Sequence, residues 1–194
     1  MSDPLDTVTQ FLLEVDALKT IDRRTYIKGG SRLENSAEHS WHLAMACWAL
    51  SEHLALDLCQ NTLIKLALVH DLGEIDAGDT FLYADSRNDA HEQERECVAR
   101  LQGHAGNPIK DLMELWDTQE YSNKPEAKLL KVVDRILPFL LNIENEGRTW
   151  RELGVKRSQV VAAHAFINED FPQIHEWLSR KVTLAVVNGW LIDA

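Results

Sequence analysis

Residues 62–74 read TLIKLALVHDLGE, and this stretch decides the fold. Most of its first eight residues are apolar, and the apolar positions recur at helical spacing, which predicts a buried helix. His70 and Asp71 then follow directly. Burying an adjacent imidazole and carboxylate is costly unless partners or a metal ion compensate. From this spacing alone, a metal site and an ordinary hydrogen-bonded pair are equally good interpretations.

Two further stretches each place a polar residue among apolar residues at helical spacing. SAEHSWHLA, residues 36–44, carries His39, and KLLKVVDRI, residues 128–136, carries Asp134. With the His-Asp pair they make a mixed nitrogen and oxygen set, which suits a divalent Mn, Fe, Co, Ni or Zn ion and leaves coordination positions for water. We therefore expect a metal site between helices, held by His39, His70, Asp71 and Asp134.

The rest of the chain also predicts helices, without a convincing strand-like alternation, so the expected fold class is all-α. Residues 21–35, IDRRTYIKGGSRLEN, form a basic and turn-prone segment. Pro138 predicts a kink beside Asp134, and Asn35 or Ser36 can cap the helix that follows them. The expected helices cover residues 7–18, 37–54, 62 to about 76–79, 86–101, 109–118, 126–145, 157–167 and 172–191.

Length, charge and composition bound the class of protein. The 194 residues favour one compact domain. Twenty basic against 31 acidic residues give a net charge of −11, which repels nucleic-acid phosphates and argues against DNA or RNA as a partner. The N-terminus lacks the features of a signal peptide and the apolar runs stay below about 18 residues, which predicts a cytoplasmic protein without a membrane partner. The three cysteines lack metal or disulfide spacing, and we expect buried reduced thiols.

The arrangement of His39, His70, Asp71 and Asp134 resembles that of the HD-domain superfamily of metal-dependent phosphohydrolases. The resemblance covers roughly residues 7–145. Within it, ENSAEHS, LALVHDLGEIDAGD and ELWDTQEYSNKPEAKLLKVVDRI are similar to short single-domain HD proteins that include bacterial 5′-deoxynucleotidases. This implies one HD domain over residues 1–194, a helical bundle with the metal site between helices, whose C-terminal helices, about 146–194, match no motif.

The resemblance also implies roles for residues outside the ligand set, although each of them can also be an ordinary surface side chain. Glu74 takes the position of a catalytic carboxylate, and Asp79 that of an aspartate near the substrate. Arg23 resembles a phosphate-binding arginine, and Arg32 is a second candidate for the same anion. Arg24 departs from the pattern, because the relative has an aromatic residue there. The candidates for substrate binding are Arg23, Arg24, Arg32, Glu120 and Tyr121.

These features predict an enzyme that hydrolyses the 5′-phosphomonoester of nucleoside or deoxynucleoside monophosphates. Three alternatives remain open: a two-metal phosphodiesterase or an iron oxygenase of the same superfamily, with further ligands from His91 or His104, and a nucleotide-binding regulatory protein without turnover. A homodimer is plausible because relatives often pair. The apolar segment at residues 182–192 either forms that interface or completes the core.

Overall fold

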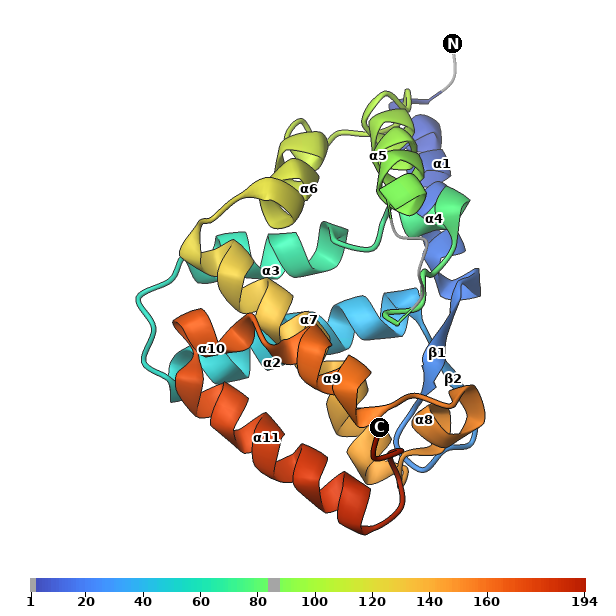
Figure 1. Cartoon of the computed structure of the whole chain (residues 1–194). Coiled ribbons are helices and arrows are strands. Elements are labelled where there is room, and N and C mark those ends of the chain that lie inside the picture. Colours follow the sequence, from blue (N-terminus) through green and yellow to red (C-terminus); the bar gives the residue numbers. More distant parts are fainter. Residues whose placement is uncertain (1–2, 84–87) are drawn as a thin grey trace. The chain divides into compact units, whose positions relative to one another are not determined.

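The computed structural model describes residues 3–83 and 88–194, and it is helical apart from one two-stranded sheet (Figure 1). The all-α class is therefore confirmed. Backbone contacts divide the described chain into two compact units. Unit 1 comprises residues 3–22, 35–80 and 88–131, and unit 2 comprises residues 23–34, 81–83 and 132–194. The assignment of all 194 residues to a single domain stays a prediction.

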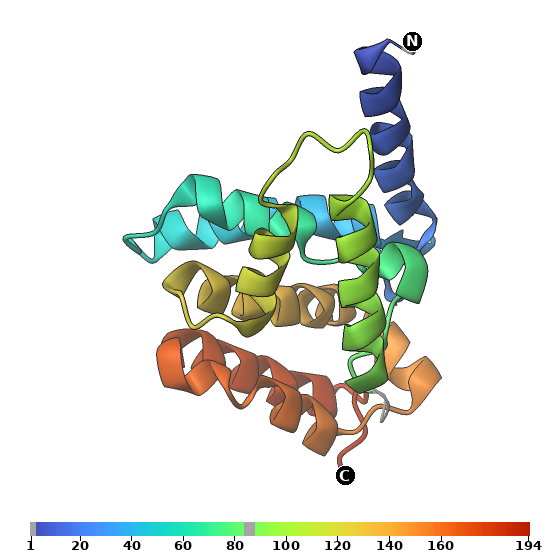
Figure 2. The same ribbon diagram turned by 90° about the horizontal axis from the view of Figure 1, so that it is seen from above.

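Unit 1 is built around a pair of helices that lie side by side, α2 (Ser36–His53) and α3 (Gln60–Val69) (Figure 1 and Figure 2). A second group of helices packs its apolar side chains around Trp116, Val98 and Leu101, all completely buried. Besides α2 and α3, the elements of unit 1 are α1 (Pro4–Asp16), η1 (Ala17–Thr20), α4 (Glu74–Ala77), α5 (Asn88–Gln102), α6 (Leu112–Tyr121) and the first turns of α7 (Pro125–Glu144).

Helix α2 begins with a capping box. The Asn35 side chain accepts a hydrogen bond from the backbone N–H of Glu38, and the Glu38 side chain accepts one from the backbone N–H of Asn35. Two of the backbone donors exposed at a helix start are thereby satisfied. Asn35, rather than Ser36, is the cap, and the helix begins one residue earlier than expected.

The prediction of one continuous helix from residue 62 to about 76–79 was wrong, because a turn interrupts it. Helix α3 ends at Val69, the chain turns through residues 70–73, and the short helix α4 follows. A side chain at Gly73 would lie 2.5 Å from Cβ of Glu94, so α5 passes directly against this turn and only glycine fits. Gly78, with φ 78°, ends α4 as the sequence predicts.

The sheet is formed by β1 (Asp22–Tyr26) and β2 (Leu33–Asn35). It belongs to unit 2 except for Asp22 and Asn35, which are assigned to unit 1. We expected only turns at residues 21–35, and this was wrong. Gly29 and Gly30 have positive φ angles and reverse the chain between the strands. The side chain of Asn145 donates to the carbonyl oxygens of Tyr26 and Ile27 at 3.3 and 3.0 Å, a tertiary anchor that local sequence does not reveal.

The C-terminal part of unit 2 is helical, as predicted, with two additional short helices at Arg148–Leu153 and Ile167–Asp170. Helix α7 continues through Pro138 to Glu144, and α8 (Arg148–Leu153) was not predicted. The kink at Pro138 stays a prediction. The elements that follow are α9 (Arg157–His164), α10 (Ile167–Asp170) and α11 (Pro172–Val187).

The apolar segment at residues 182–192 contributes both to the core and to the surface. Val182 and Leu191 are buried, whereas Leu184 and Val187 are exposed. Among the cysteines, Cys47 and Cys97 are buried free thiols as expected, but Cys59 is exposed. Of the helices in the described residues, none has the length and apolar character needed to cross a bilayer.

Candidate metal centre

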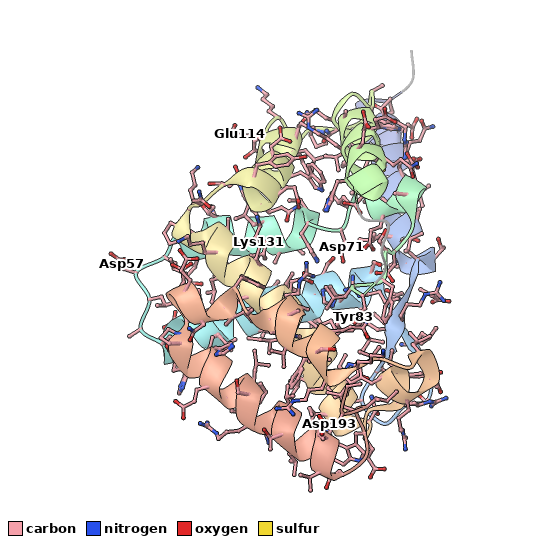
Figure 3. The ribbon with its side chains drawn as sticks, viewed as in Figure 1. Asp57, Asp71, Tyr83, Glu114, Lys131 and Asp193 are labelled. Carbon is pink, nitrogen blue, oxygen red and sulfur yellow. The ribbon has the colours of Figure 1, made fainter. Side chains whose placement is uncertain are left out.

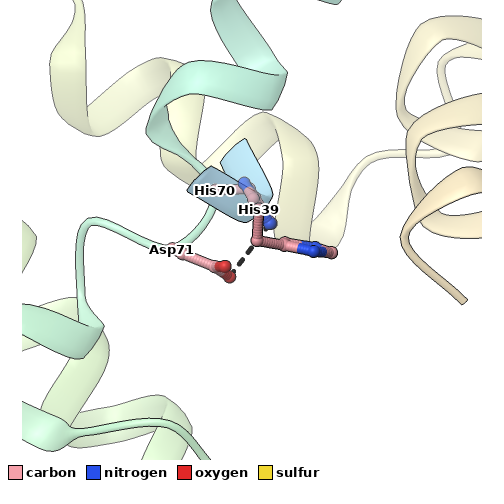
Figure 4. Close-up of side chains that lie close together, drawn as sticks. All are labelled: His39, His70 and Asp71. Atoms are coloured by element: carbon pink, nitrogen blue, oxygen red, sulfur yellow. Dashed lines mark ion pairs between the residues drawn. The ribbon is translucent and has the colours of Figure 1, made fainter. Parts of the chain in front are cut away.

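Three of the four predicted ligands converge in unit 1. His39 comes from α2, while His70 and Asp71 follow the end of α3, and one ligand atom from each lies within 4.8 Å of the others (Figure 4). Both histidines are buried, and the side chain of Asp71 is 12% exposed. The packing of α2 on α3 therefore creates a compact nitrogen and oxygen group at the end of α3, where Figure 3 labels Asp71.

The hydrogen bonding of His70 fits a metal ligand. Nδ1 lies 2.8 Å from the carbonyl oxygen of Ala67, and because a carbonyl only accepts, Nδ1 carries the proton. In the neutral imidazole, Nε2 then presents a lone pair. It is buried and lies 3.0 Å from Oδ1 of Asp71, yet it has no hydrogen-bond partner among the described residues. Two acceptors held this close fit a shared cation. A backbone carbonyl that accepts a hydrogen bond from the other ring nitrogen commonly fixes the tautomer of a histidine ligand.

Neighbouring helices of unit 1 hold this turn in place. The indole Nε1 of Trp116 on α6 donates to the carbonyl oxygen of His70 at 3.2 Å. The thiol of Cys97 on α5 donates to the carbonyl oxygen of Leu72 at 3.5 Å. Burial raises the pKa of the Cys97 thiol to about 11, so it stays a neutral donor. The turn at residues 70–73 is thus supported by hydrogen bonds from two helices.

The proposed catalytic carboxylate lies directly after this turn. Glu74 is the first residue of α4 and is buried, and its carboxylate accepts a 2.5 Å hydrogen bond from the hydroxyl of Ser36. Its backbone N–H donates to the carbonyl oxygen of Asp71 at 3.0 Å. Asp79 follows the end of α4 and is half-buried. Ser36 was considered only as a helix cap, because its contact with Glu74 spans 38 positions along the chain.

An ion-pair network that we did not predict fixes α4 from outside. Arg100 on α5 donates two hydrogen bonds to Asp76, at 2.8 and 3.0 Å, and a third to Glu14 on α1 at 2.5 Å. These hydrogen bonds hold the pKa of the Asp76 carboxyl below its usual value. Sequence offers no signal for this triad, since its members lie on three helices.

Replacing Arg100 by Ala is expected to lower the free energy of unfolding by about 1 kcal/mol, since the bidentate pair is half-exposed. Because the pKa of Asp76 is lowered in the folded state, its contribution is present above about pH 4 and is lost as the pH falls further. The free energies of unfolding of the parent and of Arg100→Ala, measured in urea, should therefore differ at pH 7, and the difference should shrink toward pH 3. A difference that stays constant with pH would contradict the assigned pairing of Arg100 with Asp76.

The arginine candidates lie in unit 2. Nε of Arg23 on β1 is 3.8 Å from Oε2 of Glu34, and their side chains are only 12% and 4% exposed. Arg24 and Arg32 are exposed, and Nη1 of Arg32 donates to the carbonyl oxygen of Leu33 at 2.9 Å. Arg23 is therefore the least exposed of the three, and its side chain lies near the buried carboxylate of Glu34.

The fourth predicted ligand also belongs to unit 2. Asp134 lies in α7, its side chain is 22% exposed, and Oδ2 is 3.0 Å from Nη1 of Arg135. The chain passes from unit 1 into unit 2 between Lys131 and Val132. The place of Asp134 in the ligand set therefore stays a prediction.

The remaining candidates lie on α5 and α6 or in the loop between them, within unit 1. Oε1 of Glu120 is 3.5 Å from Nδ1 of His91, and the backbone carbonyl of Glu120 accepts a 2.6 Å hydrogen bond from Lys131. Tyr121 is 61% exposed. His104 accepts a hydrogen bond from its own loop and packs against α1. Neither His91 nor His104 belongs to the group of converging ligand atoms.

A His, His and Asp group that could hold a metal ion lies on a helical scaffold, with the buried carboxylate of Glu74 following it in the chain. The chain belongs to the HD domain family, whose model matches residues 15–175. It is thereby a member of a family of metal-dependent phosphohydrolases, and the predicted resemblance is confirmed.

Individual relatives support the same assignment. The chain is 34% identical to the 5′-deoxynucleotidase HDDC2 of Bos taurus, over 71% of this chain and 67% of that protein, and 31% identical to the Homo sapiens protein of the same name, over 72% and 69%. The match to the Danio rerio protein covers 66% of its length at 28% identity, so the chain spans about two thirds of these curated relatives.

Solved structures share the fold. A predicted metal-dependent phosphohydrolase from Magnetospirillum magnetotacticum superposes with a TM-score of 0.88 and 35% identity, over 97% of this chain and 95% of the other. An HD-domain phosphohydrolase from Listeria innocua, with a TM-score of 0.54 and 15% identity over 91% and 98%, shares the fold alone. The helical architecture is therefore that of the HD domain.

Proposed function

We propose that the protein is a metal-dependent phosphohydrolase that cleaves the 5′-phosphomonoester of nucleoside or deoxynucleoside monophosphates. The observation that carries this proposal is the group of His39, His70 and Asp71, with the buried carboxylate of Glu74 directly after it. Relatives named 5′-deoxynucleotidase favour this class of substrate. Nothing in the proposal depends on the identity of the base.

His39, His70, Asp71 and Asp134 would hold the divalent ion, and their mixed donors suit Mn, Co, Fe, Ni or Zn. When bound, such an ion lowers the pKa of a coordinated water and offsets negative charge on the phosphate. Glu74 would move a proton at the attacking water or at the leaving oxygen, with Asp79 assisting. Arg23, aided by Arg32, would hold phosphate oxygens. Arg24, Glu120 and Tyr121 would contact the remainder of the nucleotide.

Phosphate release from a panel of nucleoside and deoxynucleoside 5′-monophosphates tests the proposal. The protein is stripped with chelator, dialysed, and assayed with Mn²⁺, Co²⁺, Fe²⁺, Ni²⁺ or Zn²⁺ added separately. We expect turnover only with added metal and a much lower rate with the corresponding 3′-monophosphates. Absence of phosphate release with every metal and nucleotide would overturn the proposal. One metal ion per chain by elemental analysis separates it from two-metal enzymes of the superfamily.

Replacing Arg23 by Ala is expected to lower kcat/KM by about 10-fold to 100-fold, as for loss of a charged hydrogen bond. Arg23→Lys should recover only part of this, because a guanidinium holds two phosphate oxygens and an ammonium does not. Initial rates at varied nucleotide concentration, at equal metal content, give both values.

Lys28→Ala is the matched control for Arg23. Lys28 is a cation in the same segment whose side chain is 80% exposed, near Glu144. Its loss should leave kcat/KM within about two-fold, as for an exposed surface charge. If Arg23→Ala behaves like Lys28→Ala, the phosphate is bound by other residues.

A further inference from the structure

Glu74 accepts a short hydrogen bond from a helix that is distant in sequence. Oγ of Ser36, at the start of α2, lies 2.5 Å from Oε2 of Glu74, at the start of α4. Ser36 is fully buried and Glu74 is 7% exposed. The serine hydroxyl carries a proton that it can donate, and the Glu74 carboxylate oxygen accepts it.

The single proton of the hydroxyl has two acceptors within reach, of very different quality. The carbonyl oxygen of Ile21 is 3.5 Å from Oγ of Ser36, at the outer limit of a hydrogen bond, whereas the Glu74 oxygen is at 2.5 Å. The Ser36 hydroxyl therefore donates its hydrogen bond to Glu74. A hydrogen bond to one carboxylate oxygen restricts rotation of the carboxylate plane and so narrows the directions in which the other oxygen can point.

Helix α2 has no need of this hydroxyl for its own start. The capping box already satisfies the backbone N–H groups of Asn35 and Glu38. The backbone N–H of Ser36 donates to the carbonyl oxygen of Ile21 at 3.0 Å, and its carbonyl accepts from the hydroxyl of Ser40 at 2.9 Å. What the Ser36 side chain adds is its contact with Glu74.

We propose that Ser36 is a positioning residue for Glu74, holding its carboxylate in the orientation that proton transfer requires. The inference rests on the proposed function, because it assigns Ser36 a role only through Glu74. Loss of this bond would loosen the orientation of the carboxylate, and the fraction of enzyme with a correctly oriented base or acid would fall. The effect is therefore expected in kcat rather than in KM.

A double-mutant cycle tests this. Ser36→Ala in the parent should lower kcat for a nucleoside monophosphate about 10-fold, with KM within about two-fold and metal content unchanged. In the Glu74→Ala background, where no carboxylate remains to be oriented, Ser36→Ala should change kcat less than about two-fold. If Ser36→Ala only disturbed packing or reduced the amount of folded protein, it would lower kcat equally in the parent and in the Glu74→Ala background.

Ser40→Ala is the matched control, because Ser40 is buried on the same helix and its hydroxyl donates to the helix backbone. It should leave kcat unchanged. If Ser36→Ala behaves like Ser40→Ala while Glu74→Ala is inactive, the inference fails and the proposed function stands. Equal losses in both backgrounds of the cycle also overturn the inference. If Glu74→Ala keeps the parent kcat, the assigned role of Glu74 fails first.

Discussion

Asp71→Ala is expected to lower phosphohydrolase activity by at least about 1000-fold and to remove most of the bound metal. Asp71 supplies the carboxylate oxygen beside Nε2 of His70, so its loss removes one of few protein ligands. A metal ion that stabilises charge in the transition state is worth several kcal/mol, or roughly three or more powers of ten. Elemental analysis and phosphate release on the same preparation measure both effects.

Asp57→Ala is the control for this variant. Asp57 is an exposed carboxylate that precedes α3, whereas Asp71 follows it, and Figure 3 labels both. Its removal should change neither metal content nor rate. Full metal occupancy in Asp71→Ala would show that the ion is held by other residues.

Chelation separates loss of metal from loss of fold. An ion that binds only the folded chain adds about 2.7 kcal/mol of stability at a free concentration 100 times its Kd. For a chain of this length that corresponds to a rise in Tm of roughly 5 to 11 °C. The parent should therefore lose this increment in chelator, while Asp71→Ala should lose little. An identical Tm of the parent with and without chelator would contradict a contribution of the ion to stability.

The sequence predicted that His39, His70 and Asp71 would come together, because these residue types are costly to bury without compensation. His39 and the His70-Asp71 pair stand out among apolar residues of two helices, and those helices pack together. The sequence also predicted where most helices lie, because apolar spacing and the breaks at Gly78 and Pro125 are local signals.

Features that depend on tertiary contacts were not predictable. The turn after Val69 depends on the approach of α5 to Gly73, and the hairpin at residues 22–35 is anchored by Asn145. The Ser36 to Glu74 hydrogen bond joins residues that no local pattern relates. Burial of polar residues can thus be anticipated from sequence, but their partners require the fold.

Glu74→Ala is expected to lower kcat by about 10² to 10⁴, the usual contribution of general acid or base catalysis, while metal content stays at the parent level. The reason for this split is positional. Glu74 is outside the group of ligand atoms formed by His39, His70 and Asp71, yet its backbone is bonded to Asp71, so it lies beside the ligands without being one of the three. Steady-state kinetics and elemental analysis on one preparation check the loss of kcat and the unchanged metal content.

Glu74→Gln sharpens the test because glutamine keeps the shape of the side chain and can still accept the hydrogen bond from Ser36. An amide cannot take up a proton near neutral pH, so this variant should be as slow as Glu74→Ala if the carboxylate transfers a proton. If instead Glu74 only supports the turn after Asp71, glutamine should retain most of the activity and alanine should lose both metal and stability. Glu114→Ala, an exposed carboxylate on α6, should leave kcat unchanged. A Glu74→Gln enzyme with more than about a tenth of the parent kcat would assign proton transfer elsewhere, with Asp79 the next carboxylate to replace.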